Sequence, residues 1–499
     1  MKKLLKPENI ALLAGVIIAA LLLLFGPFVG VADNGDFLRM MNTIGLNYYD
    51  AAESYEDRFF AFSHSQFAYD DLFRGFYPSS QIFLVLIPRL LGGLVHGSYF
   101  DIRMLGVVYA LLLLAATWLA VKSVSRGSAA AGLLTAAVML FVFYDIGYLA
   151  YFNSLFGEPV SLVFMLLTFA LGLRLLSAGG AGRNSRSYSF GSGLGGGTSL
   201  FGREEAPVRL LVLFFVSVLF LVMSKIQNSP VGVLFALMFW RLAYVYEGRR
   251  WRKLALSFAA AAFVVSVLMY VTAPKDLKHI NLYQTIFYGV LYDSPDVKAD
   301  LKELGLPERL EVLAGTNYFE AGTAIPQNDP SLGPDFYDRI SHKDVLLFYL
   351  KHPARLIGNM EYAASNSMSI RPSYLGNYEK AEGKPRGALT STYSGWSRFK
   401  TEGIPNTLAF LGIFYLLYYA GAVFEWFRAS DRRGRAVSEL LMLPGLIGIF
   451  AFMVPILGDG RADMGKHLFL FNVSFDMMVV TMAGWVVLKL ARLWKGSRW

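Results

Sequence analysis

The sequence predicts an all-α polytopic membrane protein with about ten transmembrane helices. Of its 499 residues, 55% are hydrophobic and only 17% are charged, and the mean hydropathy is +0.44. Apolar runs that approach or exceed the roughly 20 residues needed to cross a bilayer recur along the whole chain. The excess of basic residues, which gives a net charge of +9, lies in short loops beside these runs. This placement is typical of the cytoplasmic loops of membrane proteins and indicates no nucleic-acid partner.

Both ends of the chain are expected in the cytoplasm. Lys2, Lys3 and Lys6 precede the first apolar run, Ala11 to Val31, and a basic tail closes the sequence from Lys489 onward. The first run is too long for a signal peptide and no small-residue cleavage site follows it, so we expect an uncleaved helix. The chain has no cysteine, which excludes disulfides, thiolate catalysis and metal sites built from cysteine.

Ten spans place every short basic loop on the cytoplasmic side at once, which is the main support for this topology. Seven spans are expected within residues 1–272 and three within residues 404–499. In chain order the first five cover about 11–31, 102–122, 129–148, 159–176 and 208–223. The sixth follows the turn 224–230 and returns to Gly248, and the seventh and eighth cover about 254–271 and 407–427. The ninth reaches Leu457, and the tenth follows the turn 458–467 and leads to the basic tail.

Three segments are not expected to be ordinary spans. Residues 32–102 form a first external loop, in which the apolar stretch Gln81 to Leu94 is too short to cross, so we expect an interfacial or re-entrant helix. The Gly/Ser/Arg-rich residues 178–207 are expected to form a disordered cytoplasmic loop. Residues 273–403 are polar and rich in aromatic residues, and we expect them to form a small, mainly helical external domain.

This topology brings polar clusters from separate parts of the sequence to the outer ends of the spans. The carboxylates Asp33 and Asp36 follow the first span, and Glu158 precedes the fourth. Charges at a membrane boundary are costly unless they face water, a partner or a reacting group. The other members of this outer set are Lys225, Gln227, Asn228, Arg461, Asp463, Lys466 and His467.

Acidic and basic groups at the depth of the lipid headgroups favour one chemistry. The basic side chains would hold a lipid-linked phosphate, and a carboxylate would take a proton from an incoming hydroxyl group. Charges already in place would then stabilise the leaving phosphate. These are the requirements for glycosyl transfer from a polyprenyl-phosphate sugar.

Other interpretations stay open from the residues alone. Asp33 and Asp36 could cap a helix, Glu158 could complement a helix dipole, and residues 225–228 and 458–467 could be polar turns. The chain could also be a flippase or transporter of a lipid-linked saccharide, although its spans contain few polar residues. A third interpretation is a non-catalytic membrane scaffold that binds glycan through residues 273–403.

The order of these features resembles the polytopic glycosyltransferases of the GT-C superfamily. The matching positions are the acids Asp33 and Asp36, the interfacial stretch Tyr77 to Leu94, Arg103 at the start of the next span, Glu158, and Lys466-His467. More narrowly, residues 32–37 and 458–472 resemble the hexosyltransferases of Gram-positive S-layer glycan gene clusters.

The resemblance implies a GT-C-like fold and an inverting transfer on the external face of the cell membrane. The donor would be a polyprenyl-phosphate hexose, and the acceptor would be an external glycan or a lipid-linked acceptor. The implied catalytic residues are Asp36, Asp33 and Glu158. The implied ligands of the donor phosphate are Arg461, Lys466, His467, Lys225 and Arg103.

Two points of this resemblance stay open. Many relatives have adjacent acids, whereas Asp33 and Asp36 are three positions apart, so either could be the base, and Asp36 with Phe37 is closer to the usual acid–aromatic pair. Some relatives use a divalent cation. Asp33, Asp36 and Glu158 could hold Mg²⁺ or Mn²⁺ through oxygens, but no metal is required if Arg461 and Lys466 hold the phosphate.

Overall fold

The computed structural model describes residues 6–126, 128–178 and 207–496. Within these residues it has the all-α polytopic architecture that the sequence predicts, and a helix coincides with each of the ten predicted spans. The predicted disordered loop, residues 178–207, lies almost entirely outside the described residues.

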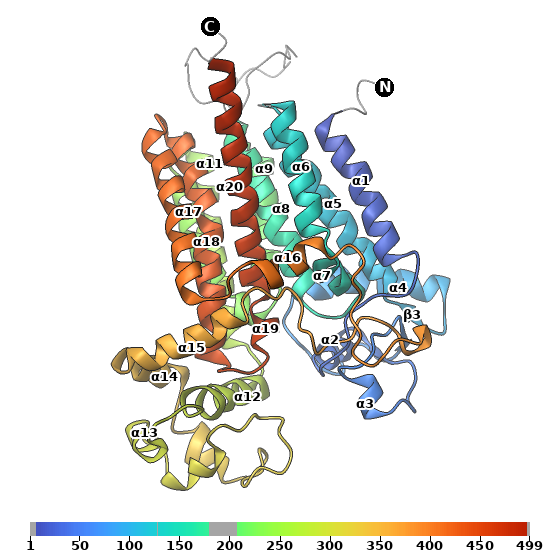
Figure 1. The fold of residues 1–499 in the computed structure, drawn as a ribbon, viewed down its shortest axis with the longest axis vertical. Coiled ribbons are helices and arrows are strands. Elements are labelled where there is room, and N and C mark those ends of the chain that lie inside the picture. The colour runs from blue at the N-terminus through green and yellow to red at the C-terminus, as the bar shows by residue number, and fades with distance from the viewer. Residues whose placement is uncertain (1–5, 127, 179–206, 497–499) are drawn as a thin grey trace.

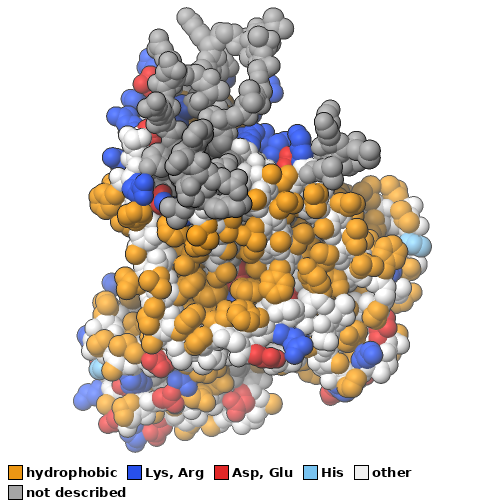
Figure 2. Space-filling view, turned by 45° about the horizontal axis from the view of Figure 1, so that its top comes forward, with side chains coloured by type: hydrophobic (Ala, Val, Ile, Leu, Met, Phe, Trp, Pro, Cys, Tyr) orange, Lys and Arg blue, Asp and Glu red, His pale blue; other side chains and the backbone are white. Residues whose placement is uncertain are grey.

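Six helices in the described part of the chain are long and apolar enough to cross a membrane. They are α5 (Arg103–Ser125), α8 (Glu158–Ser177), α11 (Arg249–Val271), α17 (Leu408–Arg428), α18 (Arg432–Gly458) and α20 (Phe469–Gly496). They run side by side in one bundle (Figure 1), and apolar side chains cover the middle of the face shown in Figure 2 between two charged ends. This apolar middle layer is what a bilayer requires of the protein surface that it contacts.

The other four predicted spans are shorter or bent. They are α1 (Pro7–Leu23), α9 (Val208–Val222), α10 (Val231–Leu242) and α6 (Ala129–Phe143), which continues into α7 (Ile146–Leu149) and η1 (Ala150–Asn153) after a bend of 54°. With 17, 15 and 12 residues, α1, α9 and α10 are shorter than a typical span.

Two predicted boundaries are wrong for identifiable reasons. The first span was expected to reach Val31, but α1 ends at Leu23, because Gly26 adopts a φ of 94° and a proline follows it. The third was expected to run straight to Tyr148, but the Asp145 carboxylate accepts the backbone N–H of Gly147 at 2.7 Å and starts a new helix there.

Residues 32–102, which were predicted to be the first external loop and are called the first loop below, contain a small sheet that the sequence did not predict. Its strands are β1 (Leu46–Tyr48), β2 (Gln66–Tyr69) and β3 (Phe100–Asp101), the helices of the first loop are α2 (Phe37–Ile44), α3 (Tyr55–Arg58) and α4 (Gln81–Val95), and the strand order is β1-β2-β3 with antiparallel pairing. Leu46 pairs with Tyr69, and Phe67 pairs with Phe100. The sheet therefore joins the start of the loop to its end.

Helix α4 matches the predicted interfacial helix. It lies at the end of α1 and α5, within the loop formed by residues 32–102 (Figure 1). Phe83, Ile87 and Leu94 on its surface are each more than half exposed. An apolar exposed face on a helix at the end of the bundle is what contact with the lipid boundary requires.

Residues 273–403 are helical, and they divide between two cores. Their elements are α12 (Lys275–Thr285), η3 (Ile286–Val290), α13 (Val297–Glu303), η4 (Glu308–Leu313), η5 (Gly333–Tyr337), α14 (His342–Lys351), α15 (Pro353–Ser365), η6 (Lys380–Glu382) and α16 (Gly395–Gly403). The part up to Tyr349 encloses a core of its own, around Tyr283, Phe287 and Phe336. From Ala363 onward, the buried residues belong to the core of the membrane bundle.

Residues 366–394, which we call the strap, fasten the external region to the first loop. The backbone N–H groups of Gly30 and Ala32 donate to the carbonyl groups of Asn377 and Gly376 at 2.9 and 2.8 Å. A Cβ atom at Gly376 would lie 1.9 Å from the carbonyl oxygen of Ala61, so only glycine fits at this crossing. The strap and the first loop therefore form one layer at the end of the bundle opposite to the start of α1 (Figure 1).

A buried ion pair anchors α16 on the bundle. The Lys400 ammonium lies 2.7 Å from the Asp476 carboxylate of α20, and neither side chain has any exposed surface. Tyr148 and Trp396 donate to the same carboxylate at 2.5 and 2.8 Å. The last span thus carries a charge that hydropathy alone does not reveal, and its counter-charge comes from a residue 76 positions earlier in the sequence.

We expect Asp476→Asn to destabilise the protein strongly. The substitution leaves the Lys400 charge buried without a counter-charge, which costs about 3–5 kcal/mol, and thermal melts of the purified protein in detergent would measure the loss. Glu402→Gln is a matched control, because it breaks an exposed pair with Arg398 on the same helix that contributes about 0–1 kcal/mol. Equal effects of the two substitutions would contradict an anchoring role for the buried pair.

Candidate functional site

The turn that follows the first span is built around the carboxylate of Asp33. This carboxylate is fully buried and accepts the backbone N–H groups of Gly35 and Phe37 at 2.8 and 3.1 Å, together with the hydroxyl of Tyr48. Burial raises the pKa of Asp33. Asp33 therefore stabilises the turn and the start of α2, and its carboxylate oxygens are occupied by hydrogen bonds within the protein.

Asp36 points instead toward basic side chains. Its carboxylate lies 2.6 Å from the Arg39 guanidinium and also pairs with Lys466, which lies between α18 and α20 and is 1% exposed. Burial raises the pKa of Asp36, but the charges of Lys466, Arg39 and Lys225 outweigh this effect and hold its pKa well below the ordinary value. Asp36 is therefore an ionised carboxylate at neutral pH.

Lys466 is held in place by several groups at once. Its ammonium lies 3.1 Å from the side-chain oxygen of Asn34 and 4.2 Å from the ring centre of Phe156. Burial lowers the pKa of Lys466, but the charges of Asp36, Asp463 and Glu158 raise it above its usual value. Lys466 thus remains a cation inside the protein.

A second buried pair lies at the start of α8. Glu158 is 1% exposed, and one of its carboxylate oxygens lies 2.7 Å from the Lys225 ammonium. The other oxygen of Glu158 is buried and has no hydrogen-bond partner among the described residues. An unpaired buried acceptor of this kind is costly in a folded protein and commonly marks a functional position.

These two pairs meet in one pocket. The residues that line it are Asp36, Arg39, Met40, Tyr77, Gln81, Leu155, Phe156, Gly157, Glu158, Ser224 and Lys225. They come from the first loop, the start of α8 and the turn after α9, and Lys466 joins them through its contact with Asp36. The structure therefore brings together acidic and basic groups from four regions that the sequence analysis placed at the outer ends of the spans.

Three other predicted phosphate ligands do not line this pocket, and each of them already interacts with other residues. His467 bonds Gln227 and Asp459 through its two ring nitrogens, each at 2.8 Å. The Arg461 guanidinium stacks between the rings of Tyr292 and Tyr362 and pairs with Asp293, and Arg103 is held by Asp101 with 44% of its side chain exposed. The remaining predicted residues also have partners: Asn228 bonds Ser161 and Ser224, and Asp463 accepts from Asn34 and Tyr374.

The proposed metal ligands do not converge. Asp33 bonds Tyr48 and the backbone, Asp36 pairs with Arg39 and Lys466, and Glu158 pairs with Lys225. Within residues 6–126, 128–178 and 207–496, no group of three or more acids, histidines or cysteines is arranged to hold a metal ion. The arrangement of these three carboxylates does not fit a shared Mg²⁺ or Mn²⁺ site.

Three polar residues of the pocket, Arg39, Gln81 and Tyr77, were not among the site residues predicted from the sequence. Arg39 lies one helical turn from Asp36, and this spacing was the available signal. Gln81 donates to the carbonyl groups of Leu155 and Phe156 at 3.0 and 2.7 Å and so positions the segment before Glu158. Burial raises the pKa of Tyr77 to about 12, so its hydroxyl stays protonated.

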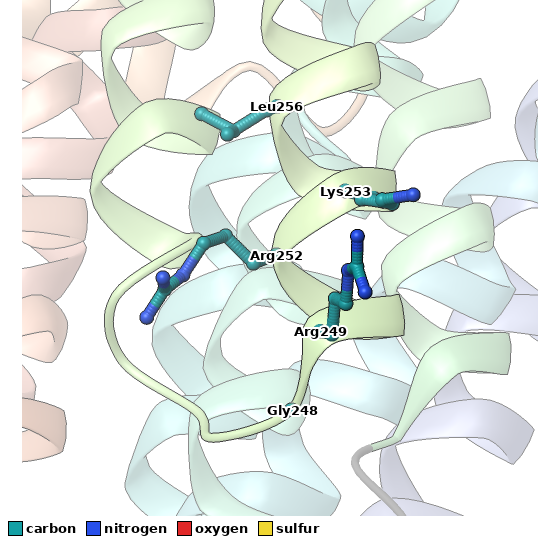
Figure 3. Close-up of a pocket in the computed structure, with 5 residues that line it drawn as sticks. All are labelled: Gly248, Arg249, Arg252, Lys253 and Leu256. Atoms are coloured by element: carbon teal, nitrogen blue, oxygen red, sulfur yellow. The ribbon is translucent and has the colours of Figure 1, made fainter.

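A second pocket lies at the opposite end of the bundle, where α11 begins. It is lined by Gly248, Arg249, Arg252, Lys253 and Leu256 and contains no carboxylate. Arg252 points away from Arg249 and Lys253 (Figure 3), so these cations do not converge on one point. This pocket lacks the paired acids and bases that glycosyl transfer requires.

We expect the single substitution Lys225→Met to destabilise the protein more than the same substitution combined with Glu158→Gln. The single substitution leaves the Glu158 carboxylate buried without its partner and costs about 3–5 kcal/mol, whereas the double variant buries no charge. Thermal melts of the single and double variants measure this difference, and additive losses would contradict it.

The pH dependence of stability follows from Asp36. Because the pKa of Asp36 is lower in the folded protein than in the unfolded chain, its ion pairs stabilise the fold above about pH 4 and lose this effect as the pH falls further. We expect the difference in melting temperature between the wild type and Asp36→Asn to be largest at neutral pH and to shrink below about pH 4. Asp71→Asn, an exposed acid of the same loop, serves as the control.

Comparison with known proteins assigns the chain to a family. A family model described as the YfdI N-terminal transmembrane domain matches residues 1–498. No curated protein matches the chain.

Solved structures with a similar arrangement include two crystal structures of the Archaeoglobus fulgidus oligosaccharyltransferase. The apo form is 12% identical over 98% of this chain and 51% of its own, with a TM-score of 0.41, and the form tethered to an acceptor peptide is 11% identical over 98% and 50%, with a TM-score of 0.42. The chain thus spans about half the length of these structures, and the TM-scores are too low to support an argument about function. The match over residues 1–498, in contrast, shows that the chain belongs to the YfdI N-terminal transmembrane domain family.

Proposed function

We propose that this protein is a membrane glycosyltransferase that moves a hexose from a polyprenyl-phosphate donor to a glycan or lipid-linked acceptor. The observation that carries the proposal is the pocket in which Asp36 and Glu158 meet Arg39, Lys225 and Lys466. The resemblance of residues 32–37 and 458–472 to S-layer glycan hexosyltransferases supports a hexose as the transferred sugar.

The charges of the pocket favour an anionic donor. Three cations, Arg39, Lys225 and Lys466, lie beside the carboxylates of Asp36 and Glu158, and a bound phosphate group would share these cations with the two carboxylates. Arg39 can bind phosphate oxygens through two N–H groups, and the lysines act as point charges.

The reaction is a single displacement. The acceptor hydroxyl oxygen bonds to the anomeric carbon of the hexose, the bond from that carbon to the phosphate oxygen breaks, and the phosphate leaves with the electron pair. Asp36 takes the hydroxyl proton. The donor phosphodiester gains one negative charge when it becomes a phosphomonoester, and the preorganised cations stabilise that charge. Attack from the face opposite to the phosphate inverts the anomeric configuration.

Asp36 suits the role of base better than Asp33. The Asp33 carboxylate is occupied by Tyr48 and two backbone N–H groups, whereas Asp36 lines the pocket and is 32% exposed. In the free protein, Arg39 and Lys466 weaken Asp36 as a base by keeping its pKa low. A donor phosphate that attracts both cations would raise its basicity at the moment when the donor is bound.

We place the pocket on the external face of the cell membrane with both termini in the cytoplasm. Basic residues form the first turns of α11 and α18 at the end of the bundle opposite to the pocket, as the positive-inside rule requires of cytoplasmic ends (Figure 1). Transport of a lipid-linked saccharide is less well supported, because the carboxylate of Asp476 in α20 is sealed by Lys400, Tyr148 and Trp396.

We expect Asp36→Asn to reduce hexose transfer by about 10²–10⁴-fold, the usual contribution of a general base. The assay offers several synthetic polyprenyl-phosphate hexoses with membrane extracts as acceptor, and mass spectrometry identifies the product. Asp71→Asn, an exposed acid in the same loop, should transfer at the wild-type rate. Gel filtration and thermal melts show that the variant is folded, and unchanged transfer by folded Asp36→Asn would rule out Asp36 as the base.

A further inference from the structure

We propose that the rings of Phe60 and Tyr374 form a platform on which a pyranose ring of the acceptor glycan stacks. The inference deepens the proposed function and rests on it. Phe60 belongs to the first loop, and Tyr374 belongs to the strap.

The two rings lie next to each other and are partly open to solvent. Phe60 is 42% exposed and Tyr374 is 41% exposed. Their ring centres lie 6.4 Å apart with an angle of 55° between the planes, so both rings are within reach of one sugar ring. Aromatic faces carry partial negative charge and attract the polarised C–H groups of a pyranose, while the sugar hydroxyls stay in contact with water and polar side chains.

The backbone holds Phe60 in a conformation that non-glycine residues rarely adopt. Its φ is 66°, and hydrogen bonds fix it on both sides: its N–H donates to the carbonyl of Asp33 at 2.8 Å, and its carbonyl accepts from Gly376 at 2.9 Å. A bulky residue in this conformation persists only where the surroundings determine it, and such residues cluster at ligand sites. The exposed ring of Phe60 is therefore preorganised beside the turn that carries Asp36.

Polar contacts lead from the platform to the proposed base. The Tyr374 hydroxyl donates to the Asp463 carboxylate, and the Asn34 side chain donates to the other oxygen of Asp463 at 2.7 Å. The same Asn34 side chain accepts from Lys466, which pairs with Asp36. A sugar stacked on the two rings would thus have hydrogen-bonding groups along one edge, in the direction of the carboxylate that removes its proton.

The surroundings of the platform are aqueous, which argues against a role as a membrane anchor. Asp57, three positions before Phe60, pairs with Lys380 and Arg386 of the strap at 2.7 and 2.9 Å, and both basic side chains are more than half exposed. The occupant is the acceptor and not the donor, because the phosphate-binding cations Arg39 and Lys225 line the pocket, whose lining does not include Phe60 or Tyr374.

The test measures sugar binding to the full-length protein in detergent, without donor. The probes are soluble trisaccharides of glucose, galactose, mannose and N-acetylglucosamine, observed by saturation-transfer NMR and titrated for Kd. We expect the wild type to bind at least one probe. The Kd for that probe should rise about tenfold or more in Tyr374→Ala and in Phe60→Gly. Tyr374→Phe keeps the ring and should bind the probe nearly as tightly as the wild type does. Phe319 is an exposed aromatic residue outside the platform, so Phe319→Ala should leave the Kd unchanged.

Phe60→Gly separates a binding role from a structural one. Glycine accepts a φ of 66° without strain, so the variant should melt at or above the wild-type temperature while it loses sugar binding. A wild type that binds none of the probes, or a Phe60→Gly variant that binds as the wild type does, would overturn the platform.

The outcomes also separate this inference from the proposed function. If Phe60→Gly loses sugar binding but the wild type transfers no hexose from any lipid-linked donor, the platform stands and the transferase proposal fails. If the wild type transfers hexose and Phe60→Gly leaves the acceptor KM unchanged, the transferase proposal stands and the platform fails.

Discussion

The ion pair between Asp36 and Lys466 joins two segments that lie 430 positions apart in the sequence. Lys466 is almost fully buried, and a buried ammonium group requires a counter-charge close by. This requirement keeps the loop after α1 against the turn between α18 and α20. Lys466 also packs on the ring of Phe156, which lies just before α8, so the same side chain ties in the segment that carries Glu158. The pocket exists because these segments are held together at one end of the bundle.

Hydropathy and charge were sufficient to predict that several charged groups from distant parts of the sequence share one end of the bundle. Asp36, Glu158, Lys225 and Lys466 were all placed at the outer ends, and the structure brings them together. The sequence could not predict toward which side of the bundle each charged side chain would point. It also could not predict which residue each of these side chains would contact. Arg461 and Arg103 were predicted at the same depth, but Asp293 and Asp101 hold them elsewhere.

Three features of the fold were not predicted from the sequence, and each has its own physical reason. The bend after α6 depends on one carboxylate, Asp145, which hydropathy reads only as a polar residue at the end of an apolar run. The small sheet of the first loop has strands of two to four residues, too short to show an alternating pattern. The Lys400–Asp476 pair joins residues that belong to different predicted regions, so neither residue alone signals the other.

Under the proposed function, helix α4 has a consequence for how a long-chain lipid donor reaches the pocket. Its first residue, Gln81, lines the pocket, and its exposed surface is apolar at Phe83, Ile87 and Leu94. Pulling a lipid tail into water costs roughly 0.8 kcal/mol for every methylene group, so desorption of such a molecule is prohibitively slow. A lipid that diffuses along α4 keeps its tail among the membrane lipids while its headgroup reaches the pocket. Turnover would then be governed by two-dimensional diffusion and by the abundance of the lipid in the leaflet, not by any dissolved concentration.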